Sequence, residues 1–227
     1  METTAVRTFS KSVDFLEKWL RFVKYNKFID NVDIIPFKCP MMKKFDKHLL
    51  PGEHFHFQDV YDYSVSVEKP ITDIIDLTFT DKYYKPKQDD FAATKVVHHK
   101  FKIPGKKVPT PEQLKTILDT MENLAKEKKV MGVHCTHGIN RTGYIICTFM
   151  VQRLGWEPQA ALEAFEAARG IPILHQEYID AVLGVKKTEE TKEETKEKAK
   201  EETKEENKNE KEKIEPQPPS PVEEKKE

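Results

Sequence analysis

The sequence has little cysteine and no long apolar run. Its three cysteines, Cys39, Cys135 and Cys147, are too few and too widely spaced for a disulfide framework. No apolar stretch approaches the roughly 18 residues that cross a bilayer, and the first residues lack the charged and apolar regions of a secretory signal. We therefore expect an intracellular protein without membrane contact, in a reducing compartment where a free thiolate survives.

Charge is distributed unevenly along the chain. Residues 186–227 contain 12 Lys and 15 Glu, no aromatic residue and almost nothing apolar. Such a segment cannot bury enough surface to offset the entropy of ordering its backbone. We expect a disordered tail, either a solvated spacer or a segment that recruits a protein partner near Ser220-Pro221. Residues 1–185 are long enough for one catalytic domain with its own core, and we expect a monomer.

Strand and helix patterns alternate through the second half of this domain. The apolar segments 74–77 and 130–134 predict buried strands, and 94–102 predicts another. Helical periodicity predicts helices at about 110–124, 144–154, 158–169 and 178–183. The prediction is an α/β fold, a partly parallel, twisted central sheet flanked by helices.

The first 70 residues give weaker patterns. Ser12 is a candidate cap for a short helix whose apolar stripe is Phe15, Leu16, Trp19, Leu20 and Val23. Residues 26–70 are broken by proline and show no clear period.

A cysteine and an arginine six residues apart lie between a predicted strand and a predicted helix. Backbone amides of such a loop, and the positive end of the helix that follows, favour bound phosphate and a thiolate at Cys135. Arg141 offers a planar fork of donors for two phosphate oxygens, and Thr142 can hydrogen-bond the sulfur as leaving group. The expected phosphate-binding residues are Thr136, His137, Gly138, Ile139, Asn140 and Arg141.

The remaining candidate ligands give little chemical signal. Cys147 lies in an apolar helical segment and is expected in the core, and Cys39 precedes a proline without a motif. Histidines occur as His54 with His56 and His98 with His99, but no cysteine or carboxylate lies at ligand spacing. We therefore expect neither a metal nor another cofactor.

The segment from His134 to Gly143, with the sequence HCTHGINRTG, closely resembles the signature of the RNA 5′-triphosphatases of the cysteine-phosphatase superfamily. That family includes the triphosphatase domain of metazoan mRNA capping enzymes, stand-alone RNA/RNP-complex-interacting phosphatases and a baculovirus phosphatase. Residues similar to other parts of the family are Ile75, Asp76, Leu77, Thr78, Tyr83, Tyr84, Ala168, Arg169 and Tyr178. The Cys, Pro and Gly that usually follow the family tryptophan, here Trp19, are absent.

The resemblance carries specific implications. It implies a dual-specificity-like cysteine-phosphatase fold, metal-independent attack on an RNA 5′ end, Cys135 as nucleophile and Arg141 as phosphate binder. Asp76 occupies the place of a family aspartate thought to assist catalysis. A nuclear or nucleocytoplasmic location follows from the family alone.

Leaving-group chemistry favours the same substrate independently. Protein phosphatases of this superfamily protonate the leaving oxygen with an aspartate on a loop upstream of the cysteine, and the corresponding residues 103–107 contain none. A nucleotide diphosphate needs little protonation, because its conjugate acid has a pKa of about 6. Lys102, Lys106 and Lys107 could hold the polyphosphate. The substrate is then an RNA with a 5′-triphosphate or diphosphate end.

Two other functions stay open. A dual-specificity protein phosphatase would be favoured if Asp76, Glu112 or Asp119 acted as general acid. A non-catalytic module that binds RNA 5′ ends is opposed by the presence of both Cys135 and Arg141. The sequence contains no Lys-x-Asp-Gly motif, so it predicts no guanylyltransferase.

Overall fold

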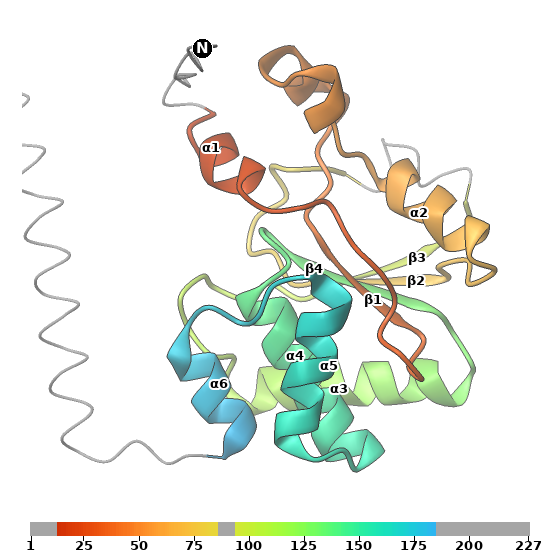
Figure 1. Ribbon diagram of the computed structural model, residues 1–227, viewed down its shortest axis with the longest axis vertical. Coiled ribbons are helices and arrows are strands. Elements are labelled where there is room, and N and C mark those ends of the chain that lie inside the picture. The colour runs from red at the N-terminus through yellow and green to blue at the C-terminus, as the bar shows by residue number, and fades with distance from the viewer. Residues whose placement is uncertain (1–12, 86–93, 185–227) are drawn as a thin grey trace, which may run out of the picture. The chain divides into compact units, whose positions relative to one another are not determined.

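The computed structural model describes residues 13–85 and 94–184. The candidate cap Ser12 and the Lys/Glu-rich tail 186–227 lie outside these residues. Four parallel strands form one sheet in the order β1-β4-β2-β3 (Figure 1). Their bounds are β1 Ile34–Lys38, β2 Asp73–Asp76, β3 Val97–Lys100 and β4 Met131–Cys135.

The strand register gathers polar side chains at one edge of the sheet. Lys38 pairs with Cys135, and Asp76 pairs with His134, at the carboxyl ends of β1, β2 and β4. In open α/β sheets this carboxyl edge is where ligands bind. The topology therefore brings Cys135 and Asp76 into the same region from positions 59 residues apart in the sequence.

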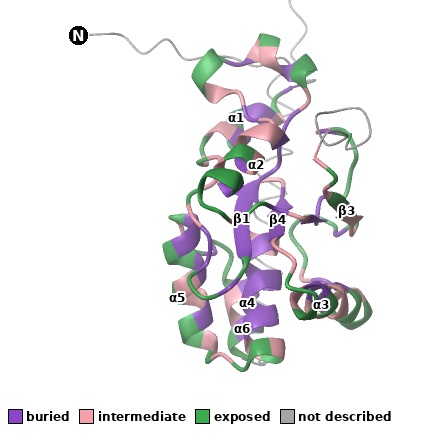
Figure 2. Cartoon of the chain, turned by 90° about the vertical axis from the view of Figure 1, so that its right-hand side faces the viewer, coloured by how far each residue is buried: buried purple, intermediate pink, exposed green. Residues whose placement is uncertain are grey.

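Helices cover both faces of the sheet. The helices of one face, below the sheet in Figure 1, are α3 Pro111–Lys126, α4 Asn140–Leu154, α5 Pro158–Arg169 and α6 Gln176–Leu183. On the other face lie α1 Phe15–Leu20, α2 Phe57–Ser66 and the short 3-10 turns Lys43–His48 and Pro51–Glu53. Figure 2 shows the strands β1 and β4 buried between them.

Alternating strand residues supply two separate cores. Ile75 and Val133 pack in the core under α3 to α6, whereas Phe37 and Ile74 pack in the core under α1 and α2. Successive side chains of a strand point to opposite faces, so both faces must be apolar when both are covered. This explains why these strands appear in the sequence as continuous apolar runs.

Most predicted elements of the second half are confirmed, with shifted boundaries. The helix after Cys135 begins at Asn140, four residues earlier than its apolar pattern indicated, so its first turn lies within the motif. The third strand covers only Val97–Lys100. The apolar stripe predicted for α1 is wrong at its last residue, because Val23 is 59% exposed and lies beyond the end of the helix. The strand β1 and the helix α2 were not predicted.

The edge strand β1 contains a proline. The backbone N–H groups of Ile34 and Lys38, on either side of it, donate to Val32 O at 2.8 Å and Lys24 O at 3.0 Å instead of to another strand. Pro36 has no N–H to donate, which is why proline occurs in sheets almost only at edges. Within the described residues, no helix is long and apolar enough to span a membrane.

Candidate active site

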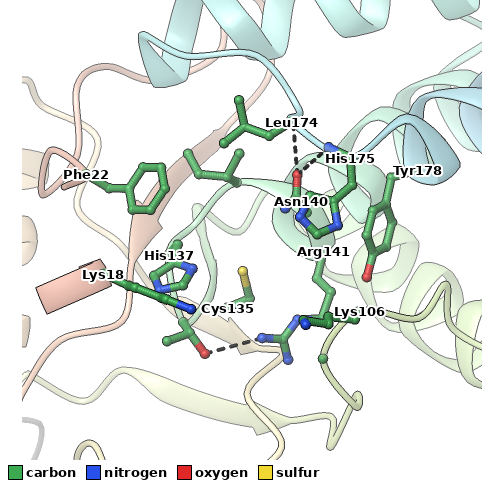
Figure 3. A pocket seen from close by; sticks show the side chains of 13 residues that line it. Lys18, Phe22, Lys106, Cys135, His137, Asn140, Arg141, Leu174, His175 and Tyr178 are labelled. Atoms are coloured by element: carbon green, nitrogen blue, oxygen red, sulfur yellow. Dashed lines mark hydrogen bonds between the residues drawn. The ribbon is translucent and has the colours of Figure 1, made fainter. Parts of the chain in front are cut away.

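The loop between β4 and α4 begins at Cys135, which is 4% exposed at the floor of a pocket (Figure 3). Burial opposes ionisation of the thiol. Arg141, the Thr142 hydroxyl and backbone amides of Gly138 and Thr142 outweigh it, so the pKa of Cys135 is lowered from its ordinary value. A buried cysteine whose pKa is lowered is suited to nucleophilic attack, because the thiolate is the reactive form.

Arg141 is held beside the cysteine by three acceptors. Its Nη1 donates to the backbone carbonyls of Leu77 at 2.9 Å and Ile103 at 2.7 Å, and its Nη2 donates to Thr136 Oγ1 at 3.2 Å. These contacts fix the guanidinium between the end of β2, the 103–107 loop and the Cys135 loop. Its charge can therefore serve a bound phosphate without a large rearrangement.

Arg169 of α5 anchors the loop from behind. This fully buried side chain donates from Nε to Gly138 O at 3.0 Å and from Nη2 to His137 O at 3.1 Å. Because peptide groups are planar, carbonyls turned toward Arg169 leave the next amide N–H groups facing the opposite way. Gly138 has φ of 70°, and any side chain there would run into the Phe37 carbonyl. A tight loop with inward amides results.

Of the other residues predicted to bind phosphate, Gly138 is not part of the pocket lining. Thr136, His137, Ile139 and Asn140 line the pocket, although Asn140 also has a structural task. Its Oδ1 accepts from the backbone N–H of Leu174 at 2.8 Å and of His175 at 3.1 Å, which holds that segment beside the pocket. The buried Thr142 hydroxyl lies beside the Cys135 sulfur, where it favours the thiolate.

Asp76 lies in a buried polar cluster instead of in the pocket lining. Its Oδ1 accepts from Thr78 N at 2.8 Å and Thr78 Oγ1 at 2.6 Å, and its Oδ2 accepts from Lys100 Nζ at 2.9 Å and lies 3.1 Å from His98 Nε2. Burial disfavours the ionised carboxylate, yet His134, His98, Lys100 and Thr78 hold the pKa of Asp76 well below its usual range.

The Asp76 cluster reaches the cysteine through His134. Burial lowers the pKa of His134 to about 4, so the ring is neutral at pH 7. Its Nδ1 lies 3.2 Å from Cys135 O and its Nε2 lies 2.7 Å from Tyr84 Oη. A neutral ring then donates from Nδ1 to the carbonyl and accepts the Tyr84 hydroxyl at Nε2. The cluster thus supports the backbone on which the thiol is carried.

Residues from distant parts of the chain complete the pocket wall. In the described residues, the lining beyond the Cys135 loop consists of Lys18, Phe22, Gly105, Lys106, Leu174, His175 and Tyr178. Lys106 was expected from the sequence, and Tyr178 only as a family landmark. Lys18, Phe22 and His175 were not singled out. None of the three belongs to a local motif, so only the fold brings them to Cys135.

The lining contains basic side chains and, among the described residues, no carboxylate. The general-acid candidates Glu112 and Asp119 both lie on α3 outside the pocket. Asp119 is paired there with Lys115 and with Arg153 at 2.9 Å. The described residues also include no group of three or more His, Cys, Asp or Glu side chains placed to hold a metal.

The catalytic domain of dual specificity phosphatases matches residues 57–188, more than half of the chain. This chain belongs to the dual-specificity phosphatase family. It is a cysteine-dependent phosphatase, and the matched residues include the Cys135 loop, α4 and α5.

Relatives refine the placement within this family. The chain is 34% identical over 170 residues to the RNA/RNP complex-1-interacting phosphatase of Bos taurus, covering 72% of this chain and 50% of that protein. It is 32% identical to a tyrosine-protein phosphatase of Autographa californica nuclear polyhedrosis virus, covering 74% and 99%. It is 33% identical to the mRNA-capping enzyme of Caenorhabditis elegans, covering 72% and 26%. These names confirm the family relationship that the Cys135 motif indicated.

The chain spans about half the length of the first of these relatives. Solved structures agree on the fold. A crystal structure of Tk-PTP aligns with a TM-score of 0.52 at 20% identity, covering 71% of this chain and 93% of that one. PTPMT1 aligns with a TM-score of 0.51 at 16% identity, covering 78% and 99%.

Proposed function

We propose that this phosphatase removes the terminal phosphate from the 5′-triphosphate end of RNA, and that it can continue from the diphosphate. The observation that carries the proposal is a basic pocket without a carboxylate in its described lining. A serine alkoxide leaves badly without a proton donor, whereas a nucleotide diphosphate leaves as a stable anion. Lys18, Lys106 and Arg141 suit its several negative charges.

The reaction runs in two displacements at phosphorus. The Cys135 thiolate attacks the terminal phosphorus, the S–P bond forms, and the bond to the bridging oxygen breaks as the RNA diphosphate leaves. Water then attacks phosphorus, the S–P bond breaks, and inorganic phosphate and the thiolate are released. Arg141 and the inward amides of residues 136–141 stabilise the transferring group, and Thr142 donates to the departing sulfur. No step requires a metal.

Asp76 acts in this proposal through Arg141. The Asp76–Thr78 hydrogen bonds close a turn whose middle residue is Leu77, and the Leu77 carbonyl accepts from Arg141 at 2.9 Å. An ionised carboxylate with a lowered pKa is a poor proton donor at neutral pH. Asp76 is therefore proposed as a positioning residue that fixes the guanidinium.

The names of the relatives support an RNA substrate, since they include an RNA/RNP complex-1-interacting phosphatase and an mRNA-capping enzyme. We extend the proposal to a nuclear or nucleocytoplasmic location, to a monomeric enzyme, and to a protein partner bound by the charged tail. A capping role would require a separate guanylyltransferase.

The deciding experiment uses RNA labelled separately at the β and γ phosphates. We expect inorganic phosphate from the γ label first, followed by the β label if the enzyme continues to the monophosphate. Cys135→Ser serves as the control for contaminating phosphatase. No release from either label by the wild-type protein would overturn the proposal, and tight binding without release would support the non-catalytic module.

A protein-phosphatase function is the second candidate, favoured by the matched family and by the viral relative named a tyrosine-protein phosphatase. The two functions differ in substrate order. We expect kcat/KM to fall from RNA triphosphate to phosphotyrosine, whose leaving group has a pKa of about 10, and further to phosphoserine. Phosphoserine cleavage that rivals RNA cleavage and is lost in Asp76→Asn would establish the alternative.

A further inference from the structure

Phe22 is an aromatic side chain on the pocket wall that the reaction at Cys135 does not use. It follows α1 and lines the pocket with Lys18, across Cys135 from His175 and Tyr178 (Figure 3). Its ring lies 5.0 Å from the His137 ring, centroid to centroid, at an angle of 32° between the ring planes. The two rings are tilted against each other and together form an aromatic surface that borders the phosphate loop.

Two buried basic side chains fix the backbone at this position. Lys38, 3% exposed, donates from Nζ to Phe22 O at 2.8 Å. Arg169, which also holds the carbonyls of His137 and Gly138, donates from Nη2 to Val23 O at 2.8 Å. The same arginine therefore sets the position of the Phe22 segment and of the phosphate loop. The backbone that carries the Phe22 ring is thereby held at a fixed position relative to the phosphate loop.

Phe22 differs from the other phenyl ring in the described pocket lining. Tyr178 is 1% exposed, packs against Tyr144 and His175, and donates its hydroxyl to Lys107 O at 2.9 Å. Its ring is therefore packed in the protein interior and is not available to a ligand. Phe22 is only half-buried, so part of its surface faces the pocket. A partly exposed aromatic surface next to a phosphate site can take another planar ring.

We propose that Phe22 stacks on the first nucleobase of the RNA whose 5′ phosphates enter the Cys135 loop; this inference rests on the proposed function. Base–aromatic stacking is independent of base identity, because every base has a π-face. Phe22 would then bind RNA ends of any starting nucleotide and would discriminate against short polyphosphates that lack a base. The neighbouring Lys18 carries the positive charge suited to the phosphates of the same nucleotide.

The test removes the ring from the enzyme and the base from the substrate in a double-mutant cycle. Wild type and Phe22→Ala are assayed on two triphosphate RNAs, one intact and one abasic at its first nucleotide. We expect Phe22→Ala to lower kcat/KM on intact RNA by roughly tenfold and to have a much smaller effect on the abasic RNA. Phe22→Trp, which keeps an aromatic ring at this position, should retain the activity of wild type on intact RNA. The matched control is Val23→Ala, which shortens an exposed side chain at the next position and should match wild type.

A binding measurement makes the test independent of turnover. A 2-aminopurine at the first position of the RNA should lose fluorescence when it stacks on Cys135→Ser protein, and should keep it with Cys135→Ser, Phe22→Leu, where the apolar packing is preserved without a ring. Equal losses on intact and abasic RNA, or unchanged fluorescence in both proteins, would overturn the inference while the proposed function stands. Failure of wild type to release phosphate from either RNA would instead remove the proposed function, and the inference with it.

Discussion

Cys135 and Asp76 are both buried at the carboxyl edge of the sheet, but their surroundings differ. Asp76 is surrounded by donors, and both of its carboxylate oxygens are satisfied by Thr78, Lys100 and His98. Cys135 instead lies in a loop that faces an open pocket, where Arg141, the Thr142 hydroxyl and the backbone amides of Gly138 and Thr142 favour its thiolate. A closed network gives rigidity, whereas donors that surround an open pocket give a binding site.

The largest expected effect separates the two regions directly. Cys135→Ser should lower turnover at least about 10⁴-fold, the scale seen when a hydrolase loses its nucleophile, because a serine hydroxyl is not ionised near pH 7. Binding of RNA triphosphate should remain, since Arg141 and the loop amides are retained. Single-turnover rates and filter binding measure the two quantities. Turnover close to that of wild type would rule out the cysteine mechanism.

Asp76→Asn should mainly lower the stability of the folded protein and should also lower kcat/KM. Removing one charge from a buried pair costs about 3–5 kcal/mol of folding free energy, and a displaced Leu77 carbonyl should lower kcat/KM by about tenfold through Arg141. Because its folded pKa is lowered, Asp76 stabilises the protein above the ordinary aspartate pKa of about 3.9. Its contribution is lost as the pH falls through the folded value, so the stability gap between variant and wild type should close in acid.

Asp73 gives the matched control on the same strand. It is also buried and lies 2.7 Å from His99 Nε2, but at the opposite end of β2 from Asp76. Asp73→Asn should lower the melting temperature and leave kcat/KM of the folded protein unchanged. Equal rate losses in the two variants would show that Asp76 has no positioning role.

Thr142→Ala should produce a smaller shift, visible in the titration of the thiol. Loss of its hydroxyl should raise the Cys135 pKa by up to about one unit, measured by the pH dependence of alkylation with iodoacetamide. Cys39 and Cys147 are buried with raised pKa values and should stay unmodified as internal controls. Thr148→Ala, which also removes a buried hydroxyl from α4, should leave the titration unchanged.

The smallest expected effect is that of a chelator. The described residues include no group of three or more His, Cys, Asp or Glu side chains placed to hold a metal, and the proposed mechanism uses none. We expect the rate and the melting temperature to be the same in EDTA. Activity lost in EDTA and restored by Mg²⁺ or Mn²⁺ would contradict the metal-independent mechanism.

Local signals explain which parts of the fold were predictable. Thr110 caps α3 with Gln113, Pro111 follows at the first helical position, and the apolar residues repeat at helical spacing, so this helix was evident. In α2 the buried positions are Phe57, Val60 and Ser64. The polar Ser64 hides the periodicity, because its side chain is buried through hydrogen bonds to Tyr61 O and Ile71 N. Sequence patterns do not reveal such tertiary partners.

The active site likewise contains residues that the sequence reveals and residues that only the fold brings together. Cys135, Arg141 and Thr142 lie within eight residues, so their chemistry could be inferred from spacing and from the strand and helix around them. Phe22 and His175 reach the pocket through long-range contacts. Phe22 is positioned through Lys38 and Arg169, and His175 through Asn140. No pattern in the sequence around either residue indicates these contacts.

Pro36 has a consequence for the behaviour of the protein at high concentration. An edge strand with free N–H groups is a template on which another chain can add a strand, and this pairing starts many aggregates. On the outer side of β1 the N–H groups of Ile34 and Lys38 are already bonded within the chain, and the position between them has none. This edge therefore cannot donate to a further strand, and the fold resists aggregation there without any charged side chain in the role.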